Sequence, residues 1–282
     1  MAAVPAVGGP LLALLSAGLW GSADFGGGLV SRRLPPVAVV AWSQSVGLLA
    51  VGVAALATGA YTAPTGWVLW SVMSGVVGTL ALVAFYAALA SGTMGVVSPI
   101  AALGAVVPVL IGLASGERPS ALQVVGIVVA LLGAAAASGP ELGGAGRARP
   151  VVLAALAGVG FGLALTFIGR GAESSTLMTL VGMRATSVTG FVVLALVVRT
   201  VGGVRTRHLL PLAAIGVADA GANLTFGIAS TMGLLSVTAV VASLYPVVTV
   251  LLARFVLSEL LRPVQQAGVV AALGGVVLMS AG

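Results

Sequence analysis

The sequence contains no cysteine, no lysine, one histidine and few charged residues of any kind. Without cysteine the chain cannot form a disulfide, a thiol nucleophile or a cysteine-ligated zinc site. Charged residues make up 6% of the 282 residues, whereas a soluble chain carries about 25%. So few charges cannot cover a water-facing surface of this size, and the composition excludes a soluble globular protein.

Hydrophobic residues make up 60% of the chain, and its twelve basic residues are all arginine, against six acidic residues. The positive net charge does not indicate a nucleic-acid partner, because no basic stripe with interleaved aromatic residues is present. The arginines instead form short clusters between apolar runs, which is how membrane proteins mark their loops. The composition therefore indicates an all-α integral membrane protein with the lipid bilayer as its surroundings.

Ten apolar runs reach the length of a membrane-spanning helix, about 17–25 residues. The longest separator between them, residues 139–150, is rich in glycine and lies near the midpoint, with five runs on each side. We therefore predict a first five-helix repeat over residues 1–138, a linker over 139–150 and a second five-helix repeat over 151–282. The ten predicted transmembrane helices cover residues 10–30, 35–57, 67–90, 94–115, 120–138, 150–170, 176–198, 208–229, 233–257 and 263–281.

The pattern Glu-x5-Gln-x2-Gly-x6-Gly-x4-Ser occurs twice, beginning at Glu117 and again at Glu259. An internal repeat of this kind decides the fold. Each copy holds five predicted helices, and because five is odd, the second copy must enter the membrane from the opposite side. The sequence therefore predicts two inverted repeats, an architecture of secondary transporters whose site lies near the bilayer midplane between the repeats. A duplication kept only for stability is the alternative.

Three motifs together resemble the EamA-type transporters of the drug/metabolite transporter superfamily. They are Trp20-Gly21-Ser22, the run Ser243-Leu244-Tyr245-Pro246-x2-Thr249, and the repeated Glu-x5-Gln-x2-Gly. The resemblance covers essentially the whole chain. It implies a multi-pass permease of the bacterial inner membrane, often an exporter of amino acids or other small metabolites. Members of this family carry an arginine in the second helix, where this chain has Gln44.

Asp24, Arg184 and Asp219 lie well inside their apolar runs. A charge near the centre of an inserted helix costs about 2.5–3.5 kcal/mol, so such residues usually face a partner or a wet cavity. Burial favours the neutral form of a carboxylic acid, so Asp24 is a candidate proton or cation site. A structural carboxylate bonded to a neighbouring helix is the alternative. Arg184 is expected either to pair with one of these carboxylates or to bind a substrate carboxylate.

Further polar side chains are expected around the same cavity. Asn223 lies four residues after Asp219, so both point to one face of a helix. That polar face lines a cavity or only holds helices together. Gln44 aligns with Arg184 at an offset of 140 residues between the repeats and is expected to line the cavity.

Three aromatic residues complete the candidate site. Tyr245 precedes Pro246, whose missing N–H loosens the helix and favours a gating bend or a static kink. Trp42 and Tyr86 are weaker candidates, because such residues often serve as packing or interfacial anchors.

These features predict a secondary transporter of small metabolites such as amino acids, with alternating access and proton coupling, and not an enzyme. The single histidine, His208, stands at a helix start beside arginines rather than at the depth that serine–histidine catalysis needs. No cluster of metal ligands is apparent, so we expect no metal and no cofactor. The expected partners are a small-molecule substrate, protons and lipid, with no nucleic acid. A membrane channel, a lipid-handling protein or a helical scaffold without coupled transport is the alternative.

The orientation of the chain is open between two interpretations. Nine arginines fall in loops after odd-numbered predicted helices and two in loops after even-numbered ones. The positive-inside rule then places both termini outside the cytoplasm, whereas the family resemblance implies that both lie inside it.

Overall fold

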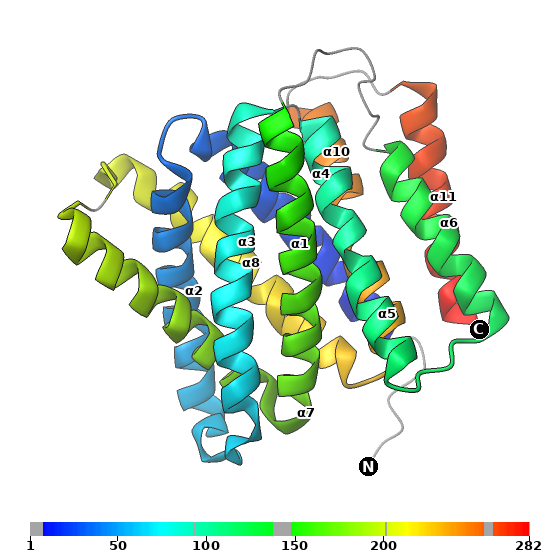
Figure 1. The fold of residues 1–282 in the computed structure, drawn as a ribbon, viewed down its shortest axis with the longest axis horizontal. Coiled ribbons are helices and arrows are strands. Elements are labelled where there is room, and N and C mark those ends of the chain that lie inside the picture. Colours follow the sequence, from blue (N-terminus) through cyan, green and yellow to red (C-terminus); the bar gives the residue numbers. More distant parts are fainter. Residues whose placement is uncertain (1–7, 93, 138–147, 201, 257–261, 282) are drawn as a thin grey trace.

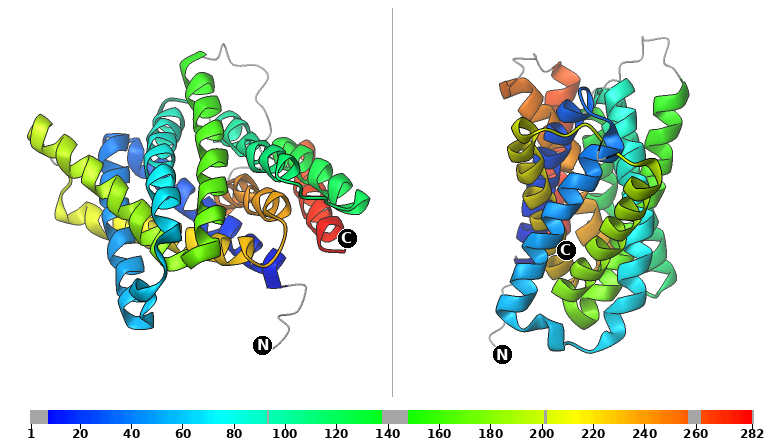
Figure 2. Two further views of the ribbon diagram at one scale, coloured as in Figure 1. Left: turned by 60° about the horizontal axis from the view of Figure 1, so that its bottom comes forward. Right: turned by 90° about the vertical axis from the view of Figure 1, so that its left-hand side faces the viewer.

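The structure, a computed structural model, describes residues 8–92, 94–137, 148–200, 202–256 and 262–281. These residues form α-helices and short 3-10 turns, with no strand among them, and the longer helices run side by side as a bundle (Figures 1 and 2). The elements in chain order are α1 (Gly8–Ser31), α2 (Pro36–Thr58), η1 (Ala60–Thr62), η2 (Thr65–Trp67), α3 (Val68–Ser91), α4 (Met94–Ala102), η3 (Leu103–Ala105), α5 (Val106–Ala114), α6 (Ala121–Ala137), α7 (Ala148–Val198), α8 (Thr206–Ser230), α9 (Leu235–Ala242), α10 (Tyr245–Val256) and α11 (Pro263–Ala281).

The all-helical class is confirmed, but the predicted helices are not all continuous. The sixth and seventh predicted helices join in α7, which is interrupted only at Ser175, where φ is −163° and ψ is 112°. The fourth is divided into α4, η3 and α5, and the ninth into α9 and α10. Four helical segments of the described chain are both long and apolar enough to cross a membrane. Ten crossings therefore remain a prediction.

Two prolines explain the divided helices. A proline cannot donate to the carbonyl four residues earlier, and its ring clashes with that carbonyl. The residue four before Pro108 is Gly104, in the 3-10 turn η3, and the residue four before Pro246 is Ala242, where α9 ends. The two breaks lie 138 residues apart, the same offset that relates the two copies of the sequence in this region.

The last helices of the two repeats, α6 and α11, pack against each other in opposite directions. A Cβ added to Gly126 would meet Gly275 and Met279, and one added to Gly133 would meet Ala272, so partner numbers fall as residue numbers rise. The contact is also reciprocal. A Cβ on Gly275 would lie 2.6 Å from the backbone N of Ala130, the equivalent of Ala272 in the first copy. Equivalent helices of the two copies therefore run antiparallel, at one edge of the bundle in Figure 1.

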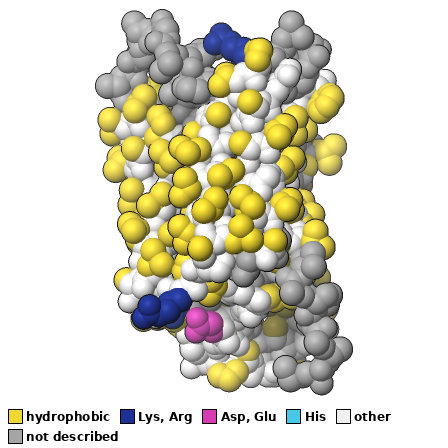
Figure 3. Space-filling model, turned by 90° about the vertical axis from the view of Figure 1, so that its right-hand side faces the viewer, with side chains coloured by type: hydrophobic (Ala, Val, Ile, Leu, Met, Phe, Trp, Pro, Cys, Tyr) yellow, Lys and Arg dark blue, Asp and Glu magenta, His cyan; other side chains and the backbone are white. Residues whose placement is uncertain are grey.

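Large apolar side chains cover the outside of the bundle as well as its core. Leu49, Leu56, Leu80, Leu196 and Leu210 are each more than two-thirds exposed. The face in Figure 3 carries yellow hydrophobic side chains over most of its height, with charged side chains only toward its two ends. An apolar band between charged ends matches the hydrocarbon layer of a bilayer.

Candidate functional site

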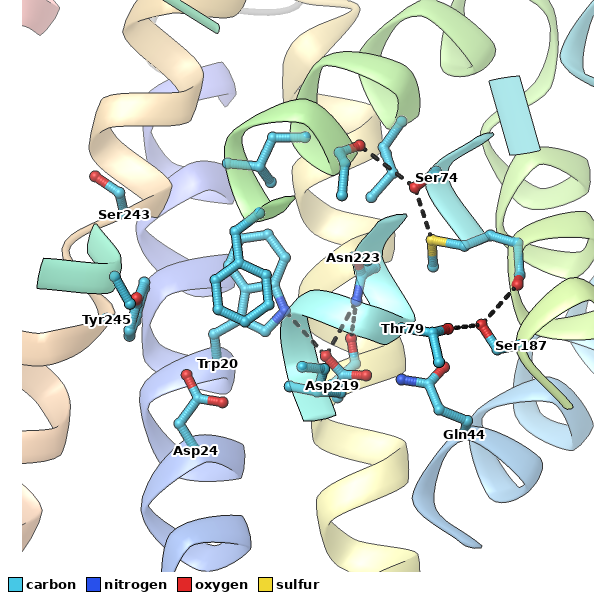
Figure 4. Close-up of a pocket in the computed structure, with 18 of the residues that line it drawn as sticks. Trp20, Asp24, Gln44, Ser74, Thr79, Ser187, Asp219, Asn223, Ser243 and Tyr245 are labelled. Atoms are coloured by element: carbon cyan, nitrogen blue, oxygen red, sulfur yellow. Dashed lines mark hydrogen bonds between the residues drawn. The ribbon is translucent and has the colours of Figure 1, made fainter. Parts of the chain in front are cut away.

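A cavity of about 90 Å³ lies inside the bundle, between segments from both halves of the chain (Figure 4). Since one water needs about 10–15 Å³ of such space, the cavity has room for several waters or one small molecule. Its lining is mostly apolar with a few polar groups, as is usual for small-molecule sites. The polar and aromatic lining residues are Trp20, Asp24, Gln44, Ser74, Thr79, Phe161, Arg184, Ser187, Asp219, Asn223, Ser243 and Tyr245.

Both proline-induced breaks reach this cavity. Ala105 of η3 and Ser243, between α9 and α10, are lining residues. Non-helical backbone at membrane depth is tolerated where it is buried in protein or lines a cavity. The breaks therefore place irregular backbone from each half next to the same space.

Among the described residues, Arg184 of α7 is the largest fully buried side chain, and it forms the centre of the polar network. Its Nη1 lies 2.7 Å from Asp219 Oδ2 of α8, and the same nitrogen donates to Gln44 Oε1 of α2. Of the two carboxylates expected to pair with Arg184, it is thus Asp219 that does so. The guanidinium of Arg184 thus joins α2, α7 and α8. Gln44 directly contacts Arg184, the residue with which it aligns between the two repeats.

The other carboxylate oxygen of Asp219 is also engaged. Trp20 Nε1 of α1 donates to Asp219 Oδ1 at 3.1 Å, and Asn223 Nδ2 donates to the same oxygen at 3.2 Å and to the Asp219 backbone carbonyl at 2.7 Å. The Asp219–Asn223 contact therefore lies within one helix rather than between helices. Both carboxylate oxygens of Asp219 therefore have partners, whereas Nε and Nη2 of Arg184 have none in the described residues.

Asp24 has a different environment. It is 7% exposed and lines the cavity, yet it has no hydrogen-bond or salt-bridge partner within the described residues. Tyr245 also lines the cavity, and its buried hydroxyl has no partner either. In Figure 4, Asp24 and Tyr245 lie to one side of Trp20, while Asp219, Gln44 and Thr79 lie to the other. We call the part of the cavity around Asp219, whose carboxylate oxygens both have partners, the saturated side. The part around Asp24 and Tyr245, whose side-chain oxygens have no partner in the described residues, is the unsaturated side.

A row of polar groups joins α3 to α7 beside the saturated side. The hydroxyls of Thr79 and Ser187 are 2.5 Å apart, and Ser187 Oγ also donates to the Met183 carbonyl at 3.0 Å. Ser74 Oγ donates to Met183 Sδ at 3.1 Å and to the Ala164 carbonyl at 3.4 Å. These bonds fix the wall of the cavity without introducing charge.

The structure brings six of the eight predicted site residues together and leaves two outside. Trp42 and Tyr86 are not among the lining residues; both belong to, or pack against, a neighbouring apolar cluster. Tyr86 is 1% exposed, and its hydroxyl donates to the Ala23 carbonyl at 3.4 Å. Trp42 and Tyr86 therefore occupy positions that fit the alternative of a packing role. The six that line the cavity are Asp24, Gln44, Arg184, Asp219, Asn223 and Tyr245.

Sequence reasoning missed several lining residues, among them Trp20, Ser74, Thr79 and Ser187. Trp20 offered a signal, because it lies four residues before Asp24 and so shares its helix face. Ser187 lies three residues after Arg184, which gave a similar signal. The hydroxyl residues of α3 offered none, since serine and threonine commonly bond to their own helix backbone in apolar helices.

Glu117 lies away from the cavity and connects the two halves. Its carboxylate oxygens accept from the backbone N–H groups of Leu235 at 3.0 Å and Ser236 at 3.2 Å, the first residues of α9. A carboxylate at a helix N-terminus satisfies otherwise unpaired donors and interacts favourably with the helix dipole. One of the two repeated glutamates therefore holds the start of a helix from the other half. Its counterpart, Glu259, lies outside the described residues.

The helical bundle, its apolar exterior and its internal cavity with a few buried polar groups are those of a membrane protein. A family model described as the EamA-like transporter family matches residues 7–139 and 148–281. The chain belongs to the EamA-like transporter family, which confirms the resemblance inferred from the sequence to EamA-type transporters of the drug/metabolite transporter superfamily. It is a multi-pass membrane protein, and members of the family are transporters rather than enzymes.

Of two further comparisons, one found no match and the other shows the fold alone. No curated protein matches the sequence. One solved crystal structure, described only as that of a protein, has a TM-score of 0.77 and 20% sequence identity, over 96% of this chain and 95% of that chain.

Proposed function

We propose that this chain is a secondary transporter of the bacterial inner membrane that moves a small metabolite by alternating access. The observation that carries the proposal is the internal cavity with its buried ionisable residues, lined from both halves of the chain. Charged residues at membrane depth usually mark substrate or ion pathways. A cavity used only for packing would not need two carboxylates and a guanidinium.

The proposed architecture is ten crossings in two inverted five-helix repeats, with the site near the bilayer midplane. The antiparallel and reciprocal packing of α6 against α11 supports inversion. The family model, which matches the two halves separately, supports the repeats. In such architectures one bundle rocks against the other around a fixed site. The proline breaks at Pro108 and Pro246 are the proposed bending points, because both adjoin the cavity.

The proposed direction is export, and the proposed cargo is a small metabolite such as an amino acid. The proposed driving force is the proton gradient, with Asp24 as the group that takes up and releases the proton. Its burial, its place in the cavity and its lack of a partner support this role. Asp219 is less suited to it, because its carboxylate already pairs with Arg184.

A substrate screen tests the transport function. A strain that overexpresses the chain is exposed to toxic concentrations of small metabolites and their analogues, and growth and intracellular accumulation are measured. The proposal predicts resistance and reduced accumulation for one chemical class, both of which are lost in an Arg184→Ala variant that still reaches the membrane. Accumulation unaffected by the chain for every compound would contradict export and favour a channel, lipid-handling or scaffold role.

A further inference from the structure

The charges in the cavity do not balance. Among its described lining residues are two carboxylates, Asp24 and Asp219, and one guanidinium, Arg184. When all three are ionised, one negative charge remains without a counter-charge. A buried charge is costly unless it is paired, so the identity of the missing partner is informative.

The positive charge of the guanidinium is already matched by the carboxylate of Asp219. Its Nη1 contacts both Asp219 and Gln44. Its Nε and Nη2 have no partner in the described residues, but both are buried. The Nε edge packs on α2, because a Cβ added to Gly47 would lie 3.4 Å from both Nε and Cζ. Arg184 therefore acts mainly as the counter-charge of Asp219.

The unsaturated side of the cavity has the composition of a cation site. Asp24 supplies the carboxylate, and Tyr245 supplies a hydroxyl oxygen that has no partner in the described residues. Three aromatic rings line the same cavity, those of Trp20, Phe161 and Tyr245. Aromatic faces attract cations, most strongly where water is excluded.

From this imbalance we infer that the cavity selects a small organic monocation, with its cationic head at Asp24 and its hydrocarbon body against the aromatic and apolar lining. The inference rests on the proposed transport function and narrows its cargo from small metabolites in general to organic cations, in place of the amino acids that the family resemblance suggests. A net-neutral amino acid would leave the site with one unmatched negative charge, because Asp219 already matches the charge of Arg184. A cation without a carboxylate completes the charge balance of the site.

Three probes of similar size and different charge test the inference on the purified full-length protein. Tetramethylammonium is a permanent cation, glycine betaine carries the same type of head plus a carboxylate, and tert-butanol is neutral. Equilibrium binding is measured by calorimetry in detergent micelles. We expect tetramethylammonium to bind about tenfold or more tighter than the other two, the difference of one charge-assisted contact. Betaine or tert-butanol binding as tightly as tetramethylammonium would overturn the inference.

Variants then assign the binding to Asp24. Asp24→Asn removes the charge at nearly constant shape and is expected to lose the preference for tetramethylammonium. Asp24→Glu keeps the negative charge and is expected to retain the preference for tetramethylammonium. This variant distinguishes an effect of the lost charge from an effect of misfolding. Glu173→Gln is the matched control, because Glu173 is 66% exposed and pairs with Arg170 outside the cavity. A preference for tetramethylammonium that persists in folded Asp24→Asn would contradict the role of this residue.

Uptake into proteoliposomes distinguishes failure of this inference from failure of transport itself. Uptake of radiolabelled tetramethylammonium but not betaine supports both. Uptake of betaine or of amino acids in preference to tetramethylammonium leaves transport standing and rejects the cationic substrate. No uptake of any of these and no metabolite efflux in the overexpressing strain would reject transport.

Discussion

At the scale of single residues, the cavity depends on a buried pair that ties three helices together. Arg184 is 1% exposed and the side chain of Asp219 is 13% exposed, so solvent screens their attraction weakly. Such a pair contributes little net stability compared with apolar residues of the same size, but removing one partner leaves the other charge buried and alone. The pair therefore specifies the site more than it stabilises the fold.

This difference predicts the outcome of two substitutions. Asp219→Ala should lower the free energy of unfolding by about 3–5 kcal/mol, because Arg184 then lacks its counter-charge. The double variant Arg184→Met/Asp219→Leu should recover most of that loss, because no buried charge remains. Denaturant titration in detergent measures both. Equal destabilisation of the single and the double variant would contradict the account.

The sequence revealed the charged members of the site but not their pairing. Asp24, Arg184 and Asp219 were predictable because a charge inside a long apolar run is rare and costly. Which aspartate pairs with Arg184 depends on the packing of α7 against α8 and could not be deduced from spacing. Trp42 and Tyr86 were expected at the site, but an aromatic residue fits a packed interior equally well.

At the scale of helices, close packing between the two halves depends on glycine. In α11 a Cβ added to Gly275 would lie 2.6 Å from the Ala130 N and 2.7 Å from the Gly126 O of α6, both backbone atoms that cannot easily move. A Cβ on the neighbouring Gly274 would meet nothing within 4 Å. Adjacent glycines of one helix thus have opposite structural roles.

Gly275→Ala and Gly274→Ala form a matched pair of variants. Gly275→Ala should lower the free energy of unfolding by about 1–3 kcal/mol, because the two helices must separate. Gly274→Ala should stabilise by up to about 1 kcal/mol, because alanine favours the helix and meets no neighbour. Unfolding titrations in detergent compare them. Equal effects would show that α6 and α11 do not pack as described.

The start of α9 offers a second test at this scale. Glu117→Ala removes the acceptor for the N–H groups of Leu235 and Ser236 and should cost about 1 kcal/mol, the usual value of a helix cap. Glu173→Ala is the control and should stay within about 0.5 kcal/mol, because Glu173 is exposed. A cost for Glu117→Ala no larger than that of the control would contradict the capping role.

Helix existence was predictable from the sequence, whereas helix continuity was not. Long apolar runs between charged or glycine-rich separators indicated α1, α2, α3 and α8 within a few residues of their observed ends. A proline was visible inside the fourth and ninth predicted helices, but whether it bends or breaks a helix depends on neighbouring packing. The close approach of Gly104 to Gly158 is such a tertiary contact.

At the scale of the whole molecule, an experiment can test whether the chain crosses the membrane an even number of times. Ten crossings require both termini to lie on the same side of the membrane, whichever side that is. Reporter fusions at each terminus, active in only one compartment, should therefore give matching results. Matching cytoplasmic signals would agree with the family resemblance, and matching external signals with the arginine distribution. Opposite signals at the two ends would contradict ten crossings.

We propose that the cavity carries proton-coupled transport through Asp24. The most direct test of this proposal is uptake of a screened substrate into proteoliposomes, with and without an imposed proton gradient, for the unaltered chain and for Asp24→Asn. We expect gradient-driven accumulation by the unaltered chain and its loss in Asp24→Asn, while Glu173→Gln behaves like the unaltered chain. Flux that is the same without a gradient and with Asp24→Asn would contradict it.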